Sequence, residues 1–390
     1  MRVLCSAVPL EGHVRPLLPL STALASTGHE VRFATGPDFQ ARVRDAGLTP
    51  LVAGPSFAEA NAATARQPRL AALPLTQRGG ATFSQVIAPA KLPALERIMA
   101  EWKPDLVVHE CTDLAPPIAA AAAGVPAVTQ GWGLVPLPGQ TTPPASDVIR
   151  LWHARGLEPD LFAGIFGRLH LHPAPRSLQP EATVPVGRLQ PMRLEMPALP
   201  DTVLPKWAAR LRPEIRPVVY VTLGTHPFFN HPGFFRTILD GLATVDCEVV
   251  ATTGEHTDPT SLGPPPPNVH LERWLPLGPL LARCNLVVCH GGSGTLLASL
   301  AAGLPLLMLP RGADQFDNAA ACERVGVARV VMPGALAADA IADNVELLLT
   351  IESYRQNAAR LRVELDAMPD PRAVVPLLEE LALDGSRAFP

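Results

Sequence analysis

The stretch CNLVVCHGGSGTLLASLAAGLPLLMLPRGADQFDN, residues 284–318, carries the clearest fold signal in the chain. A short apolar run, Leu286–Cys289, predicts a buried strand, and the Ala- and Leu-rich residues after Thr295 predict a helix. The loop between them, His290–Thr295, contains three glycines. Glycines let a backbone approach a bulky anion closely, and the free N–H groups at a helix N-terminus attract it. The stretch therefore predicts an α/β fold with a site for a phosphorylated ligand.

Side chains in and beyond this loop add hydrogen-bonding groups to the predicted site. His290, Ser293 and Thr295 can each donate a hydrogen bond to an anion. A second strand is predicted over Leu306–Leu309, and the polar pair Asp314–Gln315 follows it, at the strand end where α/β proteins bind ligands. For the loop considered by itself, a glycine-rich turn that binds no ligand remains the alternative.

The same alternation of strands and helices runs along the whole chain. It predicts parallel βαβ units, and 390 residues suffice for two such domains. Strands are expected at Arg2–Val8, Glu30–Thr35, Leu48–Val52, Asp105–His109 and Val125–Thr129 in the first half, and at Val218–Leu223, Glu248–Thr252, Asn268–Leu271 and Ala328–Val331 in the second. We also expect a turn at Pro9–His13, helices at Pro16–Thr27 and Ser146–Leu171, and a proline-rich linker at Gly187–Pro217.

Composition excludes several classes of partner. The formal net charge is −4, only 17% of the residues are charged, and no block of Lys or Arg occurs, so neither nucleic acid nor an anionic membrane surface is expected to bind. The longer apolar runs are interrupted by Pro, Gly or charged residues before they could span a bilayer. The six cysteines are scattered without CxxC spacing, so we expect a protein of the reducing cytoplasm with no export segment.

Other kinds of site are not favoured by the sequence. His170 and His172 lie two residues apart, but no acidic or cysteine ligand is nearby, so no metal site is expected. The first βα turn and the glycine loop both lack the GxGxxG pattern of nicotinamide-dependent dehydrogenases. Ser293 is not the serine of a GxSxG nucleophile elbow, because position 295 is threonine.

Five motifs resemble those of one enzyme family. They are EGHVRPLLPL at 11–20, WLP at 274–276, HGGSGT at 290–295, GLP at 303–305 and DQFDNA at 314–319. In this order they look like the inverting glycosyltransferases of family 1, and in particular the actinomycete enzymes that attach deoxysugars to antibiotics. The resemblance implies a GT-B fold of two Rossmann-like parallel-sheet domains facing across a cleft. It further implies an acceptor domain at 1–200, a nucleotide-sugar domain at 201–375 and a C-terminal helix at 376–390 that returns to the first domain.

The resemblance also implies roles for individual residues. His13 matches the general base, which suits an imidazole because its near-neutral form can remove a proton from an acceptor hydroxyl. Glu110 matches the acidic residue that orients this base, with Asp113 as the alternative, because the family usually has aspartate. Asp314 and Gln315 match the pair that binds the hydroxyls of the donor sugar. Contacts with the nucleotide and its diphosphate are expected from Gly224, Thr225, Trp274, His290, Gly292, Ser293, Gly294 and Thr295.

Two features bear on the substrates. Phe83 and Trp132 are candidates for an apolar acceptor pocket, the alternative being that each is an ordinary core residue. Plant relatives that use UDP-sugars carry a glutamate where this chain has Ala298, and alanine cannot accept hydrogen bonds from ribose hydroxyls, which favours a dTDP-sugar over a UDP-sugar. The expected partners are a nucleotide-sugar donor and a hydrophobic natural product, with no cofactor and no metal. The protein is expected to be a monomer or a homodimer.

The predicted function is transfer of a deoxysugar from a nucleotide diphosphate to a hydroxyl of a hydrophobic natural product, with inversion. One alternative is a nucleotide-sugar epimerase with the same fold, which would need no acceptor pocket. A second is a catalytically inactive homologue that assists a partner transferase, since a fold can retain its shape without its chemistry. His13 argues against the second alternative, because a helper protein needs no base at that position.

Overall fold

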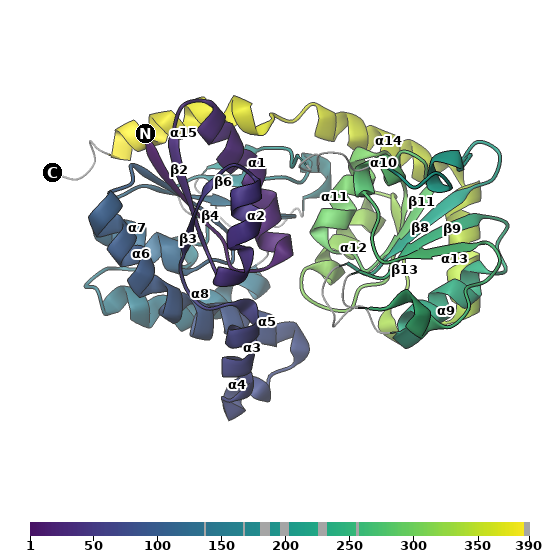
Figure 1. The fold of residues 1–390 in the computed structure, drawn as a ribbon, viewed down its shortest axis with the longest axis horizontal. Coiled ribbons are helices and arrows are strands. Elements are labelled where there is room, and N and C mark those ends of the chain that lie inside the picture. The colour runs from purple at the N-terminus through teal and green to yellow at the C-terminus, as the bar shows by residue number, and fades with distance from the viewer. Residues whose placement is uncertain are drawn as a thin grey trace. The chain divides into compact units, whose positions relative to one another are not determined.

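The computed structural model describes residues 1–135, 138–166, 168–179, 188–195, 203–224, 232–254 and 257–385, apart from the side chains of residues 75, 76, 138–143, 161 and 385. The chain divides into two compact units (Figure 1). Unit 1 comprises residues 1–174, 180–197 and 368–390, and unit 2 comprises residues 175–179 and 198–367. The last segment of the chain thus belongs to the same unit as the first.

Within the described residues, unit 1 is built on a parallel seven-stranded sheet in the order β3-β2-β1-β4-β5-β6-β7. The strands are β1 (Arg2–Ser6), β2 (Glu30–Thr35), β3 (Thr49–Val52), β4 (Leu106–Glu110), β5 (Ala127–Gln130), β6 (His170–His172) and β7 (Leu189–Pro191). The helices are α1 (Glu11–Ser26), α2 (Gln40–Asp45), α3 (Phe57–Ala65), α4 (Pro68–Ala71), α5 (Leu75–Thr82), α6 (Ala88–Trp102), α7 (Ala115–Ala123), α8 (Pro138–His153) and α15 (Pro371–Gly385).

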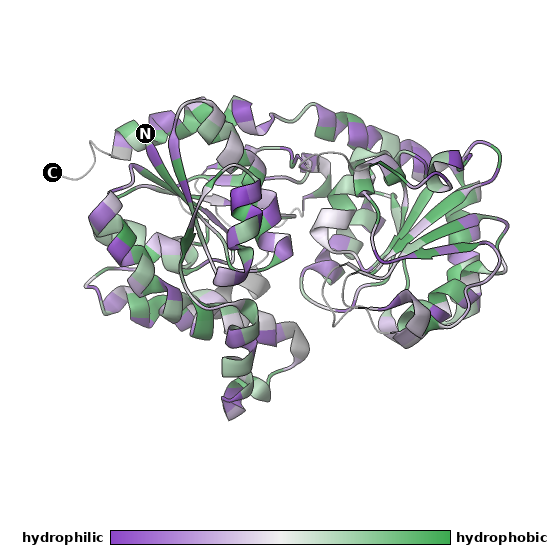
Figure 2. Cartoon of the chain, in the orientation of Figure 1, coloured by the Kyte–Doolittle hydropathy of each residue, from purple (hydrophilic) through white to green (hydrophobic). Residues whose placement is uncertain are grey.

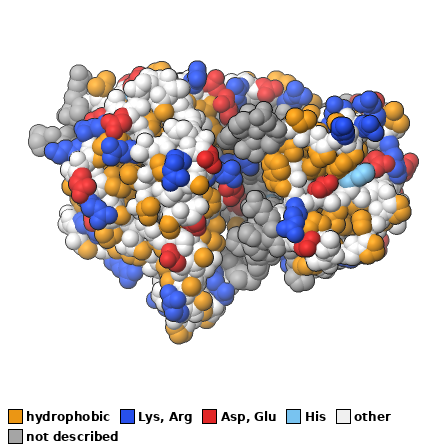
Figure 3. Space-filling model, viewed as in Figure 1, with side chains coloured by type: hydrophobic (Ala, Val, Ile, Leu, Met, Phe, Trp, Pro, Cys, Tyr) orange, Lys and Arg blue, Asp and Glu red, His pale blue; other side chains and the backbone are white. Residues whose placement is uncertain are grey.

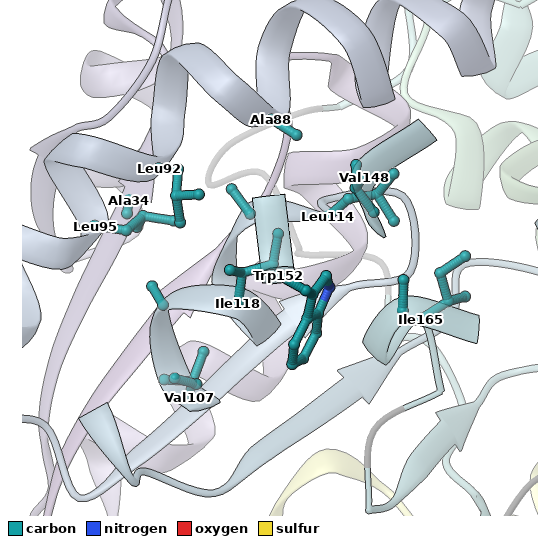
Figure 4. Packing of buried hydrophobic residues seen from close by; sticks show 14 of the residues in the cluster. Ala34, Ala88, Leu92, Leu95, Val107, Leu114, Ile118, Val148, Trp152 and Ile165 are labelled. Carbon is teal, nitrogen blue, oxygen red and sulfur yellow. The ribbon is translucent and has the colours of Figure 1, made fainter. Parts of the chain in front are cut away.

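The two faces of this sheet bury separate hydrophobic cores, as a doubly covered parallel sheet requires. Side chains of β1 alternate between them, since successive residues of a strand point to opposite faces: Leu4 belongs to one core, and Val3 and Cys5 belong to the other. Figure 4 shows part of the first core, where Trp152 of α8 lies beside Ile118 of α7. The side chains named in this paragraph are at most 2% exposed. The sheet is therefore packed closely between two layers of helices.

The C-terminal helix α15 completes the second core of unit 1. Val374, Val375 and Leu378 are buried on the side of the sheet that also carries Val3 and Cys5. At the surface of the same contact, Glu379 lies 3.1 Å from Nε2 of His29. The apolar side of α15 is therefore an integral part of unit 1.

Unit 2 contains a parallel six-stranded sheet in the order β10-β9-β8-β11-β12-β13, counted over the described residues. Its strands are β8 (Val218–Thr222), β9 (Glu248–Thr252), β10 (Val269–Glu272), β11 (Leu286–Cys289), β12 (Leu306–Met308) and β13 (Ala328–Val330). Its helices are α9 (Pro232–Leu242), α10 (Leu277–Leu281), α11 (Ser293–Ala301), α12 (Gln315–Arg324), α13 (Ala338–Thr350) and α14 (Glu352–Asp366). The central strands are strongly apolar, as Figure 2 shows, and both β8 and β11 are buried along their whole length.

One predicted boundary was wrong in a way that affects the site. The turn expected at Pro9–His13 ends early, because helix α1 begins at Glu11 and places His13 in its first turn. Pro16 suggested a later start, since proline lacks the N–H that a helix interior needs. Pro16 removes one backbone hydrogen bond from the helix, and the burial of Val14 and Leu17 on either side of it offsets that loss.

The edge of the first sheet was also predicted wrongly. The helix expected over Ser146–Leu171 ends at His153, and residues expected to be helix or linker form the short strands β6 and β7. Three-residue strands at a sheet edge carry too little alternation to be read from sequence. Pro191 is tolerated in β7 because that strand lies at the edge, where an N–H is not needed for pairing on both sides.

On the faces presented in Figure 3, positive and negative side chains are interspersed on each unit rather than gathered into fields of one sign. None of the helices in the described part of the chain is long and apolar enough to cross a membrane.

Candidate functional site

The predicted site residues lie at equivalent places in the two sheets. In unit 1 the strand order reverses between β1 and β4, and in unit 2 it reverses between β8 and β11. Ligands of open α/β sheets bind beside the carboxyl ends of the strands at such a switch point. His13 follows β1 and Glu110 is the last residue of β4, whereas Gly224 and His290 follow β8 and β11. Each unit thus presents its own candidate site.

In unit 1, His13 and Glu110 are in contact. Nδ1 of His13 lies 3.3 Å from Oε2 of Glu110, so the longer glutamate side chain does reach the histidine. The imidazole is 14% exposed and the carboxylate 2% exposed. The carboxylate is thus hidden behind the imidazole, and only the histidine retains access to solvent.

Glu110 is held as an anion by its surroundings. Burial raises the pKa of the carboxyl, but the charge of His13 and hydrogen bonds from His13 and Thr112 outweigh burial and bring the pKa down to about 2. The backbone N–H of Thr112 donates to Oε2 at 2.7 Å, and that of Val8 approaches Oε1 at 3.4 Å. A permanent negative charge beside Nδ1 favours a proton on that nitrogen and leaves Nε2 as the basic one.

Asp113, the alternative partner of His13, has a different environment. Its carboxylate forms a fully buried ion pair with Lys91 of α6 and accepts a hydrogen bond from Ser6 at 2.7 Å. Lys91 also donates to the backbone carbonyl of Ala7 at 2.8 Å. This pair ties the loop after β4 to the end of β1, whereas Glu110 is the acidic side chain in contact with His13.

The two aromatic candidates flank the same histidine. The rings of Phe83 and Trp132 meet His13 edge-on, with centroids at 5.4 and 5.5 Å. Phe83 opens a π-helical turn, Phe83–Ile87, which joins α5 to α6, and such turns are frequent at functional sites. Both rings are partly exposed, so they can contact an apolar ligand as well as hold His13.

In unit 2, His290 is enclosed by two glycines. A Cβ at Gly224 would lie 2.6 Å from Cε1 of His290, and a Cβ at Gly292 would lie 2.5 Å from Nε2. Gly224 also has a φ of +78°, which disfavours any side chain. The end of β8 and the loop after β11 therefore approach each other through this imidazole. Thr225, expected beside Gly224, lies outside the described residues.

The glycine loop leads directly into the N-terminus of α11. The helix begins at Ser293 after Gly292, and no side chain caps it. Gly294 is exposed and Thr295 half-exposed, so the first turn of the helix is accessible at the point where its free N–H groups and dipole favour an anion. The hydroxyl of Ser293 points elsewhere, since it donates to Oδ2 of Asp314 at 2.6 Å.

Asp314 and Gln315 are both engaged with their own surroundings. Oε1 of Gln315 accepts hydrogen bonds from the backbone N–H groups of Arg311 at 2.8 Å and Gly312 at 3.2 Å. The side-chain amide nitrogen is therefore the group that would contact a sugar hydroxyl. Asn318, one helical turn beyond Asp314, was not singled out from the sequence. Its amide donates to Asp314 at 2.8 Å and to the carbonyl of Gly291 at 2.9 Å, which fastens the glycine loop to α12.

Two more predicted residues lie on the same unit. Trp274 follows the carboxyl end of β10 and is 48% exposed, so its ring is available to stack on a nucleobase. Ala298 lies one turn into α11 and is half-buried. Its side chain carries no hydrogen-bonding group.

Two other features bear on whether the described residues contain a further site. A hollow of about 330 Å³ lies at the amino ends of β8–β10, lined by residues such as Trp207, Arg216 and His270, but Arg216 is paired with Asp246 and Glu248. We assign no ligand to it, since it lies at the end of the sheet away from the switch point. Among the described side chains, no three His, Cys, Asp or Glu residues are grouped as a metal site requires.

Comparison with known proteins identifies the family. The chain matches the family described as erythromycin biosynthesis protein CIII-like, its N-terminal domain over residues 22–224 and its C-terminal domain over residues 236–381. It is 34% identical to the L-demethylnoviosyl transferase of Streptomyces niveus over 84% of each chain. It is 32% identical to the elloramycin glycosyltransferase ElmGT of Streptomyces olivaceus over 96% of each chain.

A solved structure agrees with this assignment. The glycosyltransferase VinC, crystallised in complex with dTDP, is 27% identical, with a TM-score of 0.78 over 98% of this chain and 100% of its own. This likeness and the two parallel sheets confirm the predicted GT-B architecture. The chain therefore belongs to the erythromycin biosynthesis protein CIII-like family and is a family 1 natural-product glycosyltransferase.

Proposed function

We propose that this glycosyltransferase moves a deoxysugar from a dTDP-sugar to a hydroxyl group of a hydrophobic natural product, with inversion at the anomeric carbon. The observation that carries the proposal is the contact between His13 and Glu110 at the switch point of unit 1. A buried carboxylate behind a solvent-accessible imidazole is the arrangement that a general base requires. Phe83 and Trp132 beside it provide an apolar surface for the acceptor.

In the proposed reaction, Nε2 of His13 takes the proton of the acceptor hydroxyl as that oxygen attacks the anomeric carbon. A bond forms between the acceptor oxygen and the anomeric carbon, and the bond from that carbon to the diphosphate oxygen breaks. The electron pair of the broken bond leaves with the diphosphate. Attack on the side opposite the leaving group inverts the anomeric centre. Glu110 stabilises the resulting imidazolium, whose new proton is later released to solvent.

Unit 2 is proposed to receive the donor. The departing diphosphate would lie at the accessible N-terminus of α11, with His290 beside it and Trp274 against the nucleobase. Backbone N–H groups and a helix dipole can stabilise this charge, so we propose that neither a metal ion nor another cofactor takes part. Asp314 and the amide nitrogen of Gln315 would contact sugar hydroxyls.

The choice of dTDP rests on Ala298 and on one relative. A dTDP donor lacks the ribose 2′-hydroxyl, so an alanine in α11 leaves no 2′-hydroxyl without a hydrogen-bond acceptor. VinC has been crystallised with dTDP. We further propose a cytoplasmic location, which agrees with six cysteines that are all buried and form no disulfide.

The direct test is an assay of the purified chain with dTDP-deoxysugars and a panel of aromatic and macrolide aglycones. We expect a glycoside whose anomeric configuration, read from proton NMR couplings, is opposite to that of the donor. EDTA should leave the rate unchanged. Retention of configuration would contradict the proposed single displacement.

The same assay separates the alternatives. An epimerase would convert or hydrolyse the donor without any aglycone, so the acceptor-free reaction is the control for that activity. An inactive helper would give no product with any aglycone until a partner transferase is added. The relatives reported above are named as transferases, which favours transfer over both alternatives.

A further inference from the structure

A threonine hydroxyl lies between the proposed base and its acidic partner. Oγ1 of Thr112 is 3.0 Å from Nδ1 of His13, closer than the carboxylate oxygen of Glu110 at 3.3 Å. The same hydroxyl is 2.8 Å from Oε1 and 2.9 Å from Oε2 of Glu110. These three side chains form a closed triangle of polar contacts, in which the threonine makes the shortest link to the histidine.

The protons available on Glu110, Thr112 and His13 limit the possible directions of these hydrogen bonds. Glu110 is an acceptor only, because its pKa is far below neutrality. The threonine hydroxyl has a single proton, which the two nearby carboxylate oxygens attract. Its oxygen is then free to accept from Nδ1 of His13, which must carry a proton. With the threonine proton directed to Glu110, the triangle favours the neutral form of His13 that carries its proton on Nδ1 and leaves Nε2 unprotonated.

The loop that carries Thr112 is held firmly at the switch point. Its own backbone N–H binds Glu110, and the N–H groups on either side bind backbone carbonyls: Cys111 donates to Gln130 at 3.1 Å and Asp113 to Glu110 at 3.0 Å. The buried pair of Asp113 with Lys91 fixes the next side chain. The hydroxyl therefore keeps its position without being part of a helix or a strand.

We infer that Thr112 is a positioning residue of the transfer reaction, whose hydroxyl links Nδ1 of His13 to Glu110 and so presents an unprotonated Nε2 to the acceptor. This inference rests on the proposed function, in which His13 is the base. When Nε2 takes the acceptor proton, the Nδ1 proton stays on the histidine and in its hydrogen bond to Thr112. The hydroxyl then polarises toward Glu110 and stabilises the imidazolium, with no further proton transfer.

The other titratable groups around this triangle are either paired with an opposite charge or buried. Lys91 and Asp113 neutralise each other, and Glu11 on α1 pairs with Arg42. His109 is fully buried, and its Nδ1 contacts a backbone carbonyl. A change in the protonation of His13 on altering Thr112 can therefore be attributed to the triangle.

The test compares Thr112→Val, which keeps the shape and removes the hydroxyl, with Thr112→Ser, which keeps the hydroxyl. We expect Thr112→Val to lower kcat by about 10- to 100-fold, which corresponds to one lost hydrogen bond to a charged group, while KM for the donor stays unchanged. Its acid limb in the pH–rate profile should move to lower pH, because the imidazolium has lost an acceptor. Thr112→Ser should stay within about threefold of the original enzyme and keep its profile.

Thr22→Val is the matched control, since Thr22 lies on the same helix as His13 and its hydroxyl bonds only to the carbonyl of Pro19 among the contacts described. Equal rates for the valine and serine variants at position 112 would overturn the inference. A lower rate for Thr112→Val with an unmoved acid limb would also overturn it, because that outcome indicates a structural role alone.

A second readout separates this inference from the proposed function. With ¹³C-labelled histidine, the NMR signal of His13, assigned by its loss in His13→Ala, can be titrated without any substrate. We expect its midpoint to move to lower pH in Thr112→Val and not in Thr112→Ser, and equal midpoints would contradict the link. If His13→Ala still catalysed transfer, the proposed base would be wrong even though the Thr112 link was intact.

Discussion

The two switch points of this enzyme have the same strand topology and opposite chemistry. In unit 1 the carboxyl ends of β1 and β4 bring together the proposed base, His13, and the two side chains that contact it, Thr112 and Glu110. In unit 2 the loops after β8 and β11 supply glycines that admit one imidazole and expose the first turn of α11. A switch point therefore provides only a place, and the residues at and beyond the strand ends decide whether it suits proton transfer or the binding of an anion.

The largest effect is expected from removing the base at the first switch point. His13→Ala should lower the rate of sugar transfer by about 10²- to 10⁴-fold, the contribution usual for a positioned general base. Steady-state assays over a range of pH would measure it. If the variant turned over at the normal rate, the first switch point would not be the place of proton transfer.

A smaller effect is expected from a single methyl group at the second switch point. Gly292→Ala places a Cβ 2.5 Å from Nε2 of His290, so the loop or the ring must shift. An overpacked site costs about 1 to 3 kcal/mol, which would weaken dTDP binding by roughly 5- to 150-fold. Gly278→Ala is the control, because nothing lies within 4 Å of a Cβ there. Unchanged affinity in calorimetry would show that this approach of loop and ring is unimportant.

The charge on Glu110 gives a pH-dependent prediction for unit 1 alone. Burial raises its pKa, but the interactions with His13 and Thr112 lower it from 4.5 to about 2, so the anion stabilises the fold above pH 4.5 and this contribution is lost as the pH falls toward 2. The destabilisation caused by Glu110→Gln should therefore shrink by about 2 kcal/mol between pH 6 and pH 3.

Urea unfolding at the two pH values would measure this change. The exposed Glu101→Gln controls for general acid destabilisation. If the destabilisation caused by Glu110→Gln were the same at both pH values, the charge of Glu110 would not contribute to the stability of the fold.

The smallest effect concerns donor choice in α11. Ala298→Glu should add about 1 kcal/mol to the binding of UDP relative to dTDP, or roughly fivefold, because the new carboxylate can accept from the ribose 2′-hydroxyl. The exposed Ala301→Glu on the same helix is the matched control for added charge. Comparable affinities of the original enzyme for UDP and dTDP in calorimetry would remove the support for a dTDP donor.

Much of unit 2 could be predicted from sequence because its signals are local. A buried strand, a glycine loop and the start of a helix adjoin in residues 286–301, and the structure has β11 and α11 there. Asn318 was missed although it lies four residues after Asp314, a spacing that places both on one side of a helix.

The site of unit 1 was harder to predict from sequence, because its residues come from distant segments of the chain. His13 and Glu110 are 97 positions apart, and their pairing was implied by family resemblance rather than by any local pattern. The role of Thr112 depends on two interatomic distances that no sequence pattern reports. The start of α1 and the short strands β6 and β7 were missed because tertiary packing, not propensity, determines them.

We propose that the switch point of unit 1 provides the base and that of unit 2 binds the donor. Calorimetry of dTDP binding to two histidine variants tests this assignment most directly. We expect His13→Ala to bind dTDP with the affinity of the original enzyme, and His290→Ala to bind it about tenfold more weakly, as for the loss of one hydrogen bond to a charged group. The account would be contradicted if His13→Ala lost dTDP affinity to the same extent, or if His290→Ala lost none.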